Sequence, residues 1–123
     1  MKYRAICENH LYSKAYKKGK KAIAPTIAIY VLPDYRKHVL MKANPLKQYI
    51  NRIGITVGKK IGGAVQRNRA KRLIRHAYKS IDTSNHVKCG HLIVIVAREA
   101  INGKKTQDVE REMYRALKKL ELI

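Results

Sequence analysis

The sequence predicts one compact α+β domain that covers residues 1–123. A chain of this length can bury a hydrophobic core but is too short for two ordinary domains. Some short stretches alternate bulky apolar residues with small or polar ones, as strands do, and others repeat apolar residues at helical spacing. The two kinds of pattern follow each other along the chain, so helices and a sheet should share one core.

A short helix is expected near the N-terminus. Asn9 can cap its first turn and Gly19 can end it, so the helix should run to about Lys18. Tyr12 and Tyr16 are four residues apart and should share one face of this helix. Such a pair more often packs in the core or at its rim than binds a ligand. The strong positive charge described below raises the chance that this pair binds one.

Two strands with one buried face are expected next. Residues 26–32 alternate, with bulky apolar side chains on one face, and Pro33 ends the strand. Residues 53–57 alternate in the same way, with very little bulk on the second face. The second faces of both strands predict a shallow floor that is open to a flat or extended ligand, formed by Ala28, Tyr30, Gly54, Thr56 and Gly58.

The remaining connection and the C-terminal elements have simpler patterns. The stretch from Tyr35 to Asn51 is basic and has no clear period, so a long connection is expected there. Residues 92–97 are apolar on both faces, which is typical of a central strand covered on both sides. Thr106 can cap a final helix with one apolar stripe, which consists of Val109, Met113, Ala116, Leu117 and Leu120.

The segment from Ala64 to Ile81 carries the strongest pattern in the chain. One stripe of this expected helix is apolar and should lie against the sheet, and it consists of Ala70, Leu73, Ile74, Ala77 and Ile81. The opposite side is cationic, with Arg67, Lys71, Arg75 and Lys79 at intervals of four and Asn68 and Arg72 beside them. Solvated helix faces usually mix charges, but this one has no acid to pair with. Phosphate groups would relieve the repulsion between these cations.

The overall charge also indicates a polyanionic partner. The chain has 28 Lys and Arg against 8 Asp and Glu, a formal net charge of +20, and no acid occurs from Tyr35 to Ile81. No segment approaches the roughly 20 apolar residues that a membrane-spanning helix needs. The N-terminal residues do not follow the plan of a secretory signal, so a cytoplasmic location is expected.

A metal site or a protein nuclease site is not expected. Cys7 with His10 and Cys89 with His91 could in principle supply zinc ligands, but the second spacing is tight and free thiols are the simpler interpretation. The acids are few and scattered, without the pairing that general acid and base catalysis or a two-metal site requires. The sequence therefore predicts no metal ligands and no catalytic residues in the protein itself.

The choice between RNA and DNA is less direct. The predicted element order matches neither a helix-turn-helix protein nor a zinc finger. Eight tyrosines, with no Phe or Trp, supply stacking surfaces that suit splayed single-stranded nucleotides. RNA is favoured on these grounds, while a ribosomal or other structural RNA-binding protein, a nucleic-acid enzyme acting alone and a DNA-binding regulator remain as alternatives.

The central part of the chain resembles a known family. The run from Ile53 to Arg75, IGITVGKKIGGAVQRNRAKRLIR, is similar to the signature of the bacterial ribonuclease P protein component, including its Arg-Asn-Arg centre at residues 67–69. The similarity extends upstream to Tyr12, Tyr16 and Gly19 and downstream to Val-Ala-Arg at 96–98, so it covers nearly the whole chain. The departures from the family's pattern are Gly58, His76 and Leu92, which stand where Ser, Glu or Gln, and Asp are common.

The resemblance implies a more specific fold than the patterns alone. It implies a two-layer α/β sandwich with a four-stranded mixed sheet, in the order α-β-β-β-α-β-α and with a left-handed βαβ crossover. On this order the strand at 53–57 would be the third, and the second would lie within Tyr35 to Ile50.

The resemblance also implies a function. The protein would be the RNA-binding subunit of a ribonucleoprotein endonuclease, a hydrolase in which the ribonuclease P RNA removes the 5′ leader of precursor tRNA. The protein alone would bind no cofactor, magnesium would act through the RNA, and neither a membrane nor an obligate protein partner is expected. The residues implied for the catalytic RNA are Lys59, Lys60, Arg67, Asn68, Arg69, Lys71, Arg72 and Arg75. Those implied for the tRNA leader are Tyr12, Tyr16, Ala28, Tyr30 and Thr56.

Overall fold

The structure is a computed structural model that describes residues 3–6, 9–33, 51–88 and 90–123. Its strands are β1 (Tyr3–Ala5), β2 (Lys20–Ile23), β3 (Ile27–Pro33), β4 (Asn51–Thr56) and β5 (His91–Ala97). Its helices are α1 (Asn9–Lys18), α3 (Ala64–Asn85) and α4 (Thr106–Lys119), with short 3-10 turns η1 (Lys59–Ile61) and η2 (Glu99–Ile101). After β1, the order is the expected α-β-β-β-α-β-α.

The strands form one mixed sheet in the order β1-β4-β5-β3-β2. β4 pairs in parallel with both β1 and β5, whereas β3 pairs antiparallel with both β5 and β2. The short β1 adds an outer strand to the four that were expected. β4 and β5 are parallel neighbours joined through α3, which is the expected βαβ crossover. The left hand of this crossover stays a prediction.

The sequence patterns missed β2, which supplies the first of the three strands before α3. Its residues include two lysines, and Ala22 is its only buried residue, so the alternation typical of a half-buried strand is short and weak. β3 is therefore the second of these strands and β4 the third. The strand expected within Tyr35 to Ile50 lies outside the described residues.

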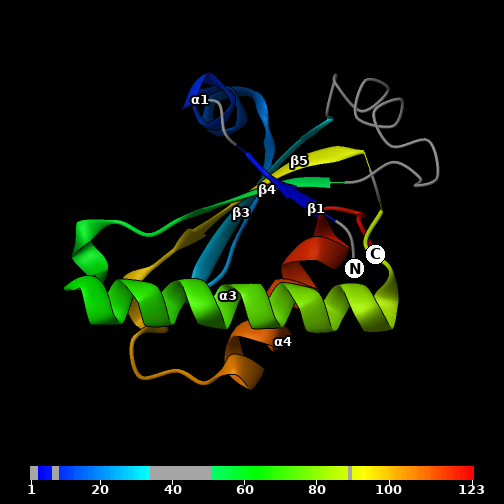
Figure 1. Ribbon diagram of the computed structural model, residues 1–123. Helices are drawn as coiled ribbons and strands as arrows, with labels where there is room; N and C mark the ends of the chain where they lie inside the picture. Colours follow the sequence, from blue (N-terminus) through cyan, green and yellow to red (C-terminus); the bar gives the residue numbers. More distant parts are fainter. Residues whose placement is uncertain (1–2, 7–8, 34–50, 89) are drawn as a thin grey trace.

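The helices lie on both faces of the sheet (Figure 1), with α3 and α4 on one and the short α1 on the other. The main two layers are thus the sheet and the α3–α4 pair, as expected. The whole apolar stripe predicted for α3 is buried in the core between these layers. β5 confirms its predicted central place, because Ile93 and Ile95 face α3 and α4 while Leu92 and Val94 face α1.

Carboxylates of α4 fasten that helix to the rest of the domain. Glu112 accepts hydrogen bonds from the backbone N–H and hydroxyl of Thr26 at 2.8 and 2.9 Å, just before β3. Glu110 accepts one from the Ser80 hydroxyl of α3 at 2.7 Å. These contacts hold α3 and α4 against the sheet, so acidic side chains in this part of the chain serve the fold.

The start of α4 differs from the expectation. Thr106 was expected to cap this helix, but it is the first helical residue and Lys105 precedes it without a side-chain cap bond. Asp108 instead accepts a hydrogen bond from the Lys105 backbone N–H at 3.1 Å. This hydrogen bond, together with nearby cations, lowers the pKa of Asp108 and outweighs the opposing effect of burial.

Candidate RNA-binding surfaces

The register of three neighbouring strands builds the floor of a cleft on the face that carries α1. Thr56 of β4 lies beside Val96 of β5, and Val96 lies beside Ala28 of β3. One step further along the strands, Gly54, Val94 and Tyr30 form a second row. Side chains two residues apart on a strand share a face, so both rows face α1.

Tyr12 of α1 lies directly on this floor. A Cβ atom at Gly54 would come within 2.5 Å of the Tyr12 hydroxyl and 2.6 Å of its ring. The Tyr12 hydroxyl also donates a long hydrogen bond of 3.5 Å to the Ile6 carbonyl. Gly54 therefore provides the space in which the Tyr12 ring sits against β4.

Tyr16 lies one helical turn further on and marks the mouth of the cleft. Its ring meets Tyr30 edge to face, with centroids 5.0 Å apart and planes at 83°. Its hydroxyl lies 3.2 Å from the Thr56 hydroxyl. Tyr16 remains 42% exposed, so its ring is held in place by β3 and β4 yet can still stack on a ligand.

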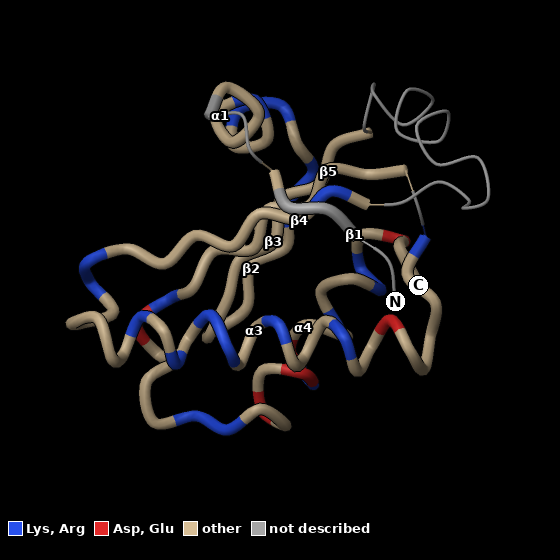
Figure 2. Tube along the Cα trace, viewed as in Figure 1, with Lys and Arg blue, Asp and Glu red and all other residues tan. Residues whose placement is uncertain are grey.

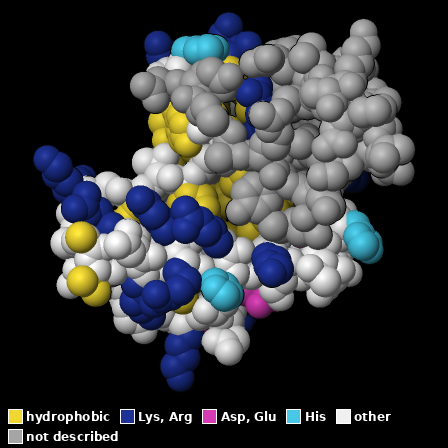
Figure 3. All heavy atoms as spheres, viewed as in Figure 1, with side chains coloured by type: hydrophobic (Ala, Val, Ile, Leu, Met, Phe, Trp, Pro, Cys, Tyr) yellow, Lys and Arg dark blue, Asp and Glu magenta, His cyan; other side chains and the backbone are white. Residues whose placement is uncertain are grey.

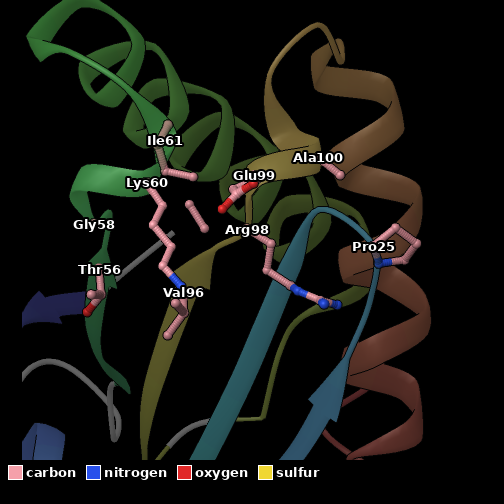
Figure 4. Close-up of a pocket in the computed structure, with 10 residues that line it drawn as sticks. Pro25, Thr56, Gly58, Lys60, Ile61, Val96, Arg98, Glu99 and Ala100 are labelled. Carbon is pink, nitrogen blue, oxygen red and sulfur yellow. The ribbon is translucent and has the colours of Figure 1, made fainter.

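A hollow of about 520 Å³ continues the floor beyond Thr56 and Val96. Lys60 of η1 extends over this floor toward Val96, while Arg98 points along the other side (Figure 4). The Arg98 guanidinium donates a hydrogen bond of 2.7 Å to the Ala24 carbonyl, which holds it at the rim. Lys60 and Arg98 therefore flank a floor of small and apolar side chains, with Glu99 as the acid among the lining residues.

The five residues predicted for the leader thus come together beside the hollow that Thr56 helps to line, and we call this region the aromatic cleft: Tyr12, Tyr16, Ala28, Tyr30 and Thr56. Ala28 forms part of its floor and is only 6% exposed. Sequence reasoning missed two members of the same face. Val96 lies between Thr56 and Ala28, and Ile23 of β2 pairs with Ala28 and is 57% exposed. Ile23 would have been found had β2 been recognised.

We give the name cationic face of α3 to Arg67, Asn68, Lys71, Arg72 and Arg75, of which the last two arginines and Asn68 point away from the sheet while Arg67 and Lys71 lie beside the buried stripe. Asn68, Arg72 and Arg75 are exposed, and Arg67 and Lys71 are partly so. Lysine and arginine positions recur along α3 (Figure 2), and their side chains gather over this helix in the space-filling view (Figure 3). Lys59 and Lys60 are also exposed, just before the helix begins.

Arg69 and Arg67 differ from the exposed cations of α3, because the first is hydrogen-bonded within the fold and the second is partly buried. The Arg69 guanidinium donates hydrogen bonds to the carbonyls of Ile101, at 3.5 Å, and Lys104, so it ties α3 to the segment before α4. The structure thus separates Arg69 from the exposed cations with which it was grouped. Arg67 is partly buried, and its Nε has no hydrogen-bond partner among the described residues.

Neither a metal-ligand cluster nor a membrane-spanning helix occurs in the described part of the chain. Its His, Cys, Asp and Glu residues form no group of three or more that could hold a metal ion. The considered zinc ligands Cys7 and Cys89 lie outside the described residues. No described helix is both long and apolar enough to cross a membrane.

Comparisons with known proteins agree with the resemblance. The chain matches the family model described as Ribonuclease P over residues 1–121. The ribonuclease P protein component of Clostridium acetobutylicum is 37% identical over 123 residues, which cover 100% of this chain and 93% of that protein. The corresponding protein of Clostridium perfringens is 35% identical over 115 residues, covering 94% and 86%.

A solved structure agrees as well. The Staphylococcus aureus RNase P protein, in a mutant form described as defective in mRNA degradation activity, superposes with a TM-score of 0.77 at 26% identity. The match covers 97% of this chain and 89% of that one. Sequence and fold are therefore similar to the same family over nearly their whole length.

Proposed function

This chain belongs to the bacterial ribonuclease P protein family, and from that premise we propose that it holds two RNAs at once. The cationic face of α3 binds the ribonuclease P RNA, and the aromatic cleft binds the 5′ leader of precursor tRNA. The protein thereby assists the magnesium-dependent 5′ maturation of tRNA. The observation that carries this proposal is the convergence of Tyr12, Tyr16, Tyr30 and Thr56 from three elements beside one hollow.

The shape of the aromatic cleft supports a single-stranded ligand. The row of its floor nearest the hollow consists of Thr56, Val96 and Ala28, which are small or medium-sized side chains on which an extended strand can lie. Tyr16 offers an exposed ring edge-on to Tyr30, and stacking on such a ring does not depend on base identity. Lys60 and Arg98 stand where they can meet the phosphates of that strand.

The charge on α3 supports a folded RNA as the second ligand. Exposed Arg72 and Arg75 can take phosphate oxygens in a bidentate way, which a planar guanidinium does well. The Nε of Arg67 is buried and has no acceptor among the described residues, so this group would gain a partner if the side chain turned outward to a phosphate. Neutralisation of these cations would also relieve their mutual repulsion along the helix.

In this proposal the bond cleavage belongs to the RNA and its bound magnesium. Several acids of the protein are occupied by the fold: Glu112 holds Thr26, Glu110 holds Ser80 and Asp108 holds the Lys105 backbone. The protein contributes affinity and orientation, which lower the amount of magnesium that the RNA needs.

Reconstitution tests the proposal directly. Adding the protein to a bacterial ribonuclease P RNA is expected to restore cleavage of precursor tRNA at a magnesium concentration too low for the RNA alone. The protein without RNA is the control and should leave the substrate intact. Cleavage by the protein alone, or no effect on the RNA reaction, would contradict the proposed division of labour.

A further inference from the structure

A second hollow, lined by several lysines, lies at one end of the sheet, and the hollow next to Thr56 and Val96 lies at the other. β3 and β5 pair from Ile27 opposite Ala97 to Pro33 opposite His91. The hollow next to the aromatic cleft adjoins the first of these pairs, and the second hollow adjoins the last. An extended strand of this length spans about 20 Å, so the two hollows are separate places on the molecule.

Four lysines surround this second hollow, which we call the lysine pocket: Lys14, Lys18, Lys20 and Lys88. Its volume is about 620 Å³, and much of its wall is apolar side chain from β3 and from the residues that follow α4. Glu121 is the acid among the residues that line it. A hollow with charges of mainly one sign and low-dielectric walls concentrates the electrostatic field and attracts anions.

The fold itself brings these lysines together. A Cβ atom at Gly19 would lie 2.5 Å from the Ala15 carbonyl oxygen and 3.0 Å from the Val31 carbonyl oxygen. Gly19 thus lets α1 end close against β3, with Lys18 before it and Lys20 after it at the edge of the pocket. The close packing of the backbone at Gly19 therefore fixes the positions from which Lys18 and Lys20 extend.

Lys88 lines the same pocket from the connection between α3 and β5. Its backbone N–H donates a hydrogen bond of 2.9 Å to the Leu122 carbonyl. The Leu122 N–H in turn donates to the Leu117 carbonyl of α4 at 2.9 Å, so the last turn of the chain and the segment before β5 are tied together. The wall that carries Lys88 is therefore fixed by backbone contacts.

A simpler explanation covers only part of this cluster. Lysines in the last turn of a helix stabilise its negative end, and Lys17 and Lys18 can serve α1 in that way. That role does not extend to Lys20 or Lys88, which belong to a strand and a connection. The lysines around this hollow come from α1, β2 and the connection before β5, and an anion bound there would reduce the repulsion between them.

We propose that the lysine pocket binds the sugar-phosphate backbone of the ribonuclease P RNA at a point distinct from the cationic face of α3. This inference rests on the proposed function, which makes that RNA the larger of the two ligands. A leader lying in the aromatic cleft meets the other end of the sheet, whereas a folded RNA can reach both ends of a domain this small. Lysine is well suited to such contacts because it binds phosphate as a compact, mobile charge.

The test compares two double variants with the same net charge. Lys20→Gln/Lys88→Gln changes two exposed lysines of the pocket, and Arg111→Gln/Arg115→Gln changes two exposed arginines of α4 that do not line it. Binding of each to ribonuclease P RNA alone, without tRNA, is measured across a salt series. The pocket variant is expected to bind more weakly and to lower the slope of log K against log salt by about one to two, while the control changes little.

The result that overturns this inference is a pocket variant that behaves like the control. A loss that appears only with precursor tRNA would overturn it too, because the pocket would then serve the substrate. Arg72→Ala, measured alongside, distinguishes a failure of the lysine pocket from a failure of the proposed function. If Arg72→Ala weakens RNA binding and the pocket variant does not, the lysine pocket alone is wrong; if wild-type protein does not bind the RNA, the proposed function is wrong. Thermal unfolding checks that each variant is folded. If either double variant is not, the single variants Lys88→Gln and Arg115→Gln, which again have the same net charge, are compared instead.

Discussion

Among the residues of the aromatic cleft, Tyr16 gives the strongest support for the proposal that a tRNA leader binds there. It is anchored by the Tyr30 ring and the Thr56 hydroxyl, yet 42% of it stays exposed. A residue placed only for packing would gain from being covered more fully. An anchored but exposed ring is pre-organised for stacking, because little side-chain freedom is lost when a base arrives.

Replacing Tyr16 should therefore affect leader recognition specifically. Tyr16→Ala is expected to lower the preference of the assembled enzyme for leader-bearing over mature tRNA by about tenfold, since a base stacked on an aromatic ring contributes about 1–3 kcal/mol. Equilibrium binding of both tRNAs measures that ratio. Tyr16→Phe keeps the ring and loses only the contact with Thr56, so it should retain most of the preference. Equal losses for both tRNAs would remove Tyr16 from the leader site.

Arg69 shows why residue type and helical spacing cannot assign a role on their own. It belongs to the same Arg-Asn-Arg centre as Arg67 and lies on the same helix. Its guanidinium is nevertheless occupied by the carbonyls of Ile101 and Lys104, which are more than 30 residues away in sequence. The segment that accepts these hydrogen bonds is distant in sequence, so the helical pattern of α3 does not predict the contact.

At the scale of elements, α3 combines a structural and a binding role on opposite sides of one helix. Its buried stripe packs against the sheet and α4, while Asn68, Arg72 and Arg75 remain exposed. The first turn of α3 contains no acid, and the helix gains no intrahelical compensation for its cations there. The stability of α3 must therefore come chiefly from the packing of its apolar stripe.

Removing a cation from this face should weaken assembly without harming the fold. Arg72→Ala is expected to lower affinity for ribonuclease P RNA and to reduce the salt slope by about one, as expected for one lost phosphate contact. The matched control is Arg115→Ala, an exposed arginine of α4. Filter binding at several salt concentrations gives both quantities. If the two variants lose affinity equally, net charge rather than the α3 face governs binding.

At the scale of the whole molecule, the sheet separates the two proposed RNA ligands. α1 and the aromatic cleft lie on one face of the sheet, and α3 with α4 lies on the other (Figure 1). η1 joins β4 to α3, and Lys60 extends from it toward the cleft floor, so the two surfaces meet at this end of the domain (Figure 4). In the proposed assembly the leader would thus lie close to the ribonuclease P RNA.

This separation predicts independent defects. Tyr16 and Arg72 share no contact in the described residues, so the double variant Tyr16→Ala/Arg72→Ala should show both losses at the sizes found in the single variants. RNA affinity and the leader ratio are measured separately on all three proteins. A coupling much above about 0.5 kcal/mol would mean that the leader site and the α3 site form one surface.

The sequence by itself determined the elements whose patterns are local and long. The α3 stripe, the buried faces of β3 and β5 and the cationic side of α3 follow from a single period read along the chain, because a regular element repeats its own geometry. The small residues of the cleft floor were also visible, since Ala28, Gly54 and Thr56 alternate with bulky neighbours. β2 escaped because an edge strand with two lysines and one buried alanine has too short a pattern to recognise.

Only the tertiary structure decided which of these faces meet. The register between β3, β4 and β5 places Ala28, Val96 and Thr56 in one row, and Gly54 lets Tyr12 settle above the next. The same long-range packing ties the Arg69 guanidinium to the segment before α4 and places Lys20 and Lys88 around one hollow. Local periodicity specifies the faces of an element, but contacts between residues distant in sequence depend on strand pairing and chain turns, which no single stretch of sequence contains.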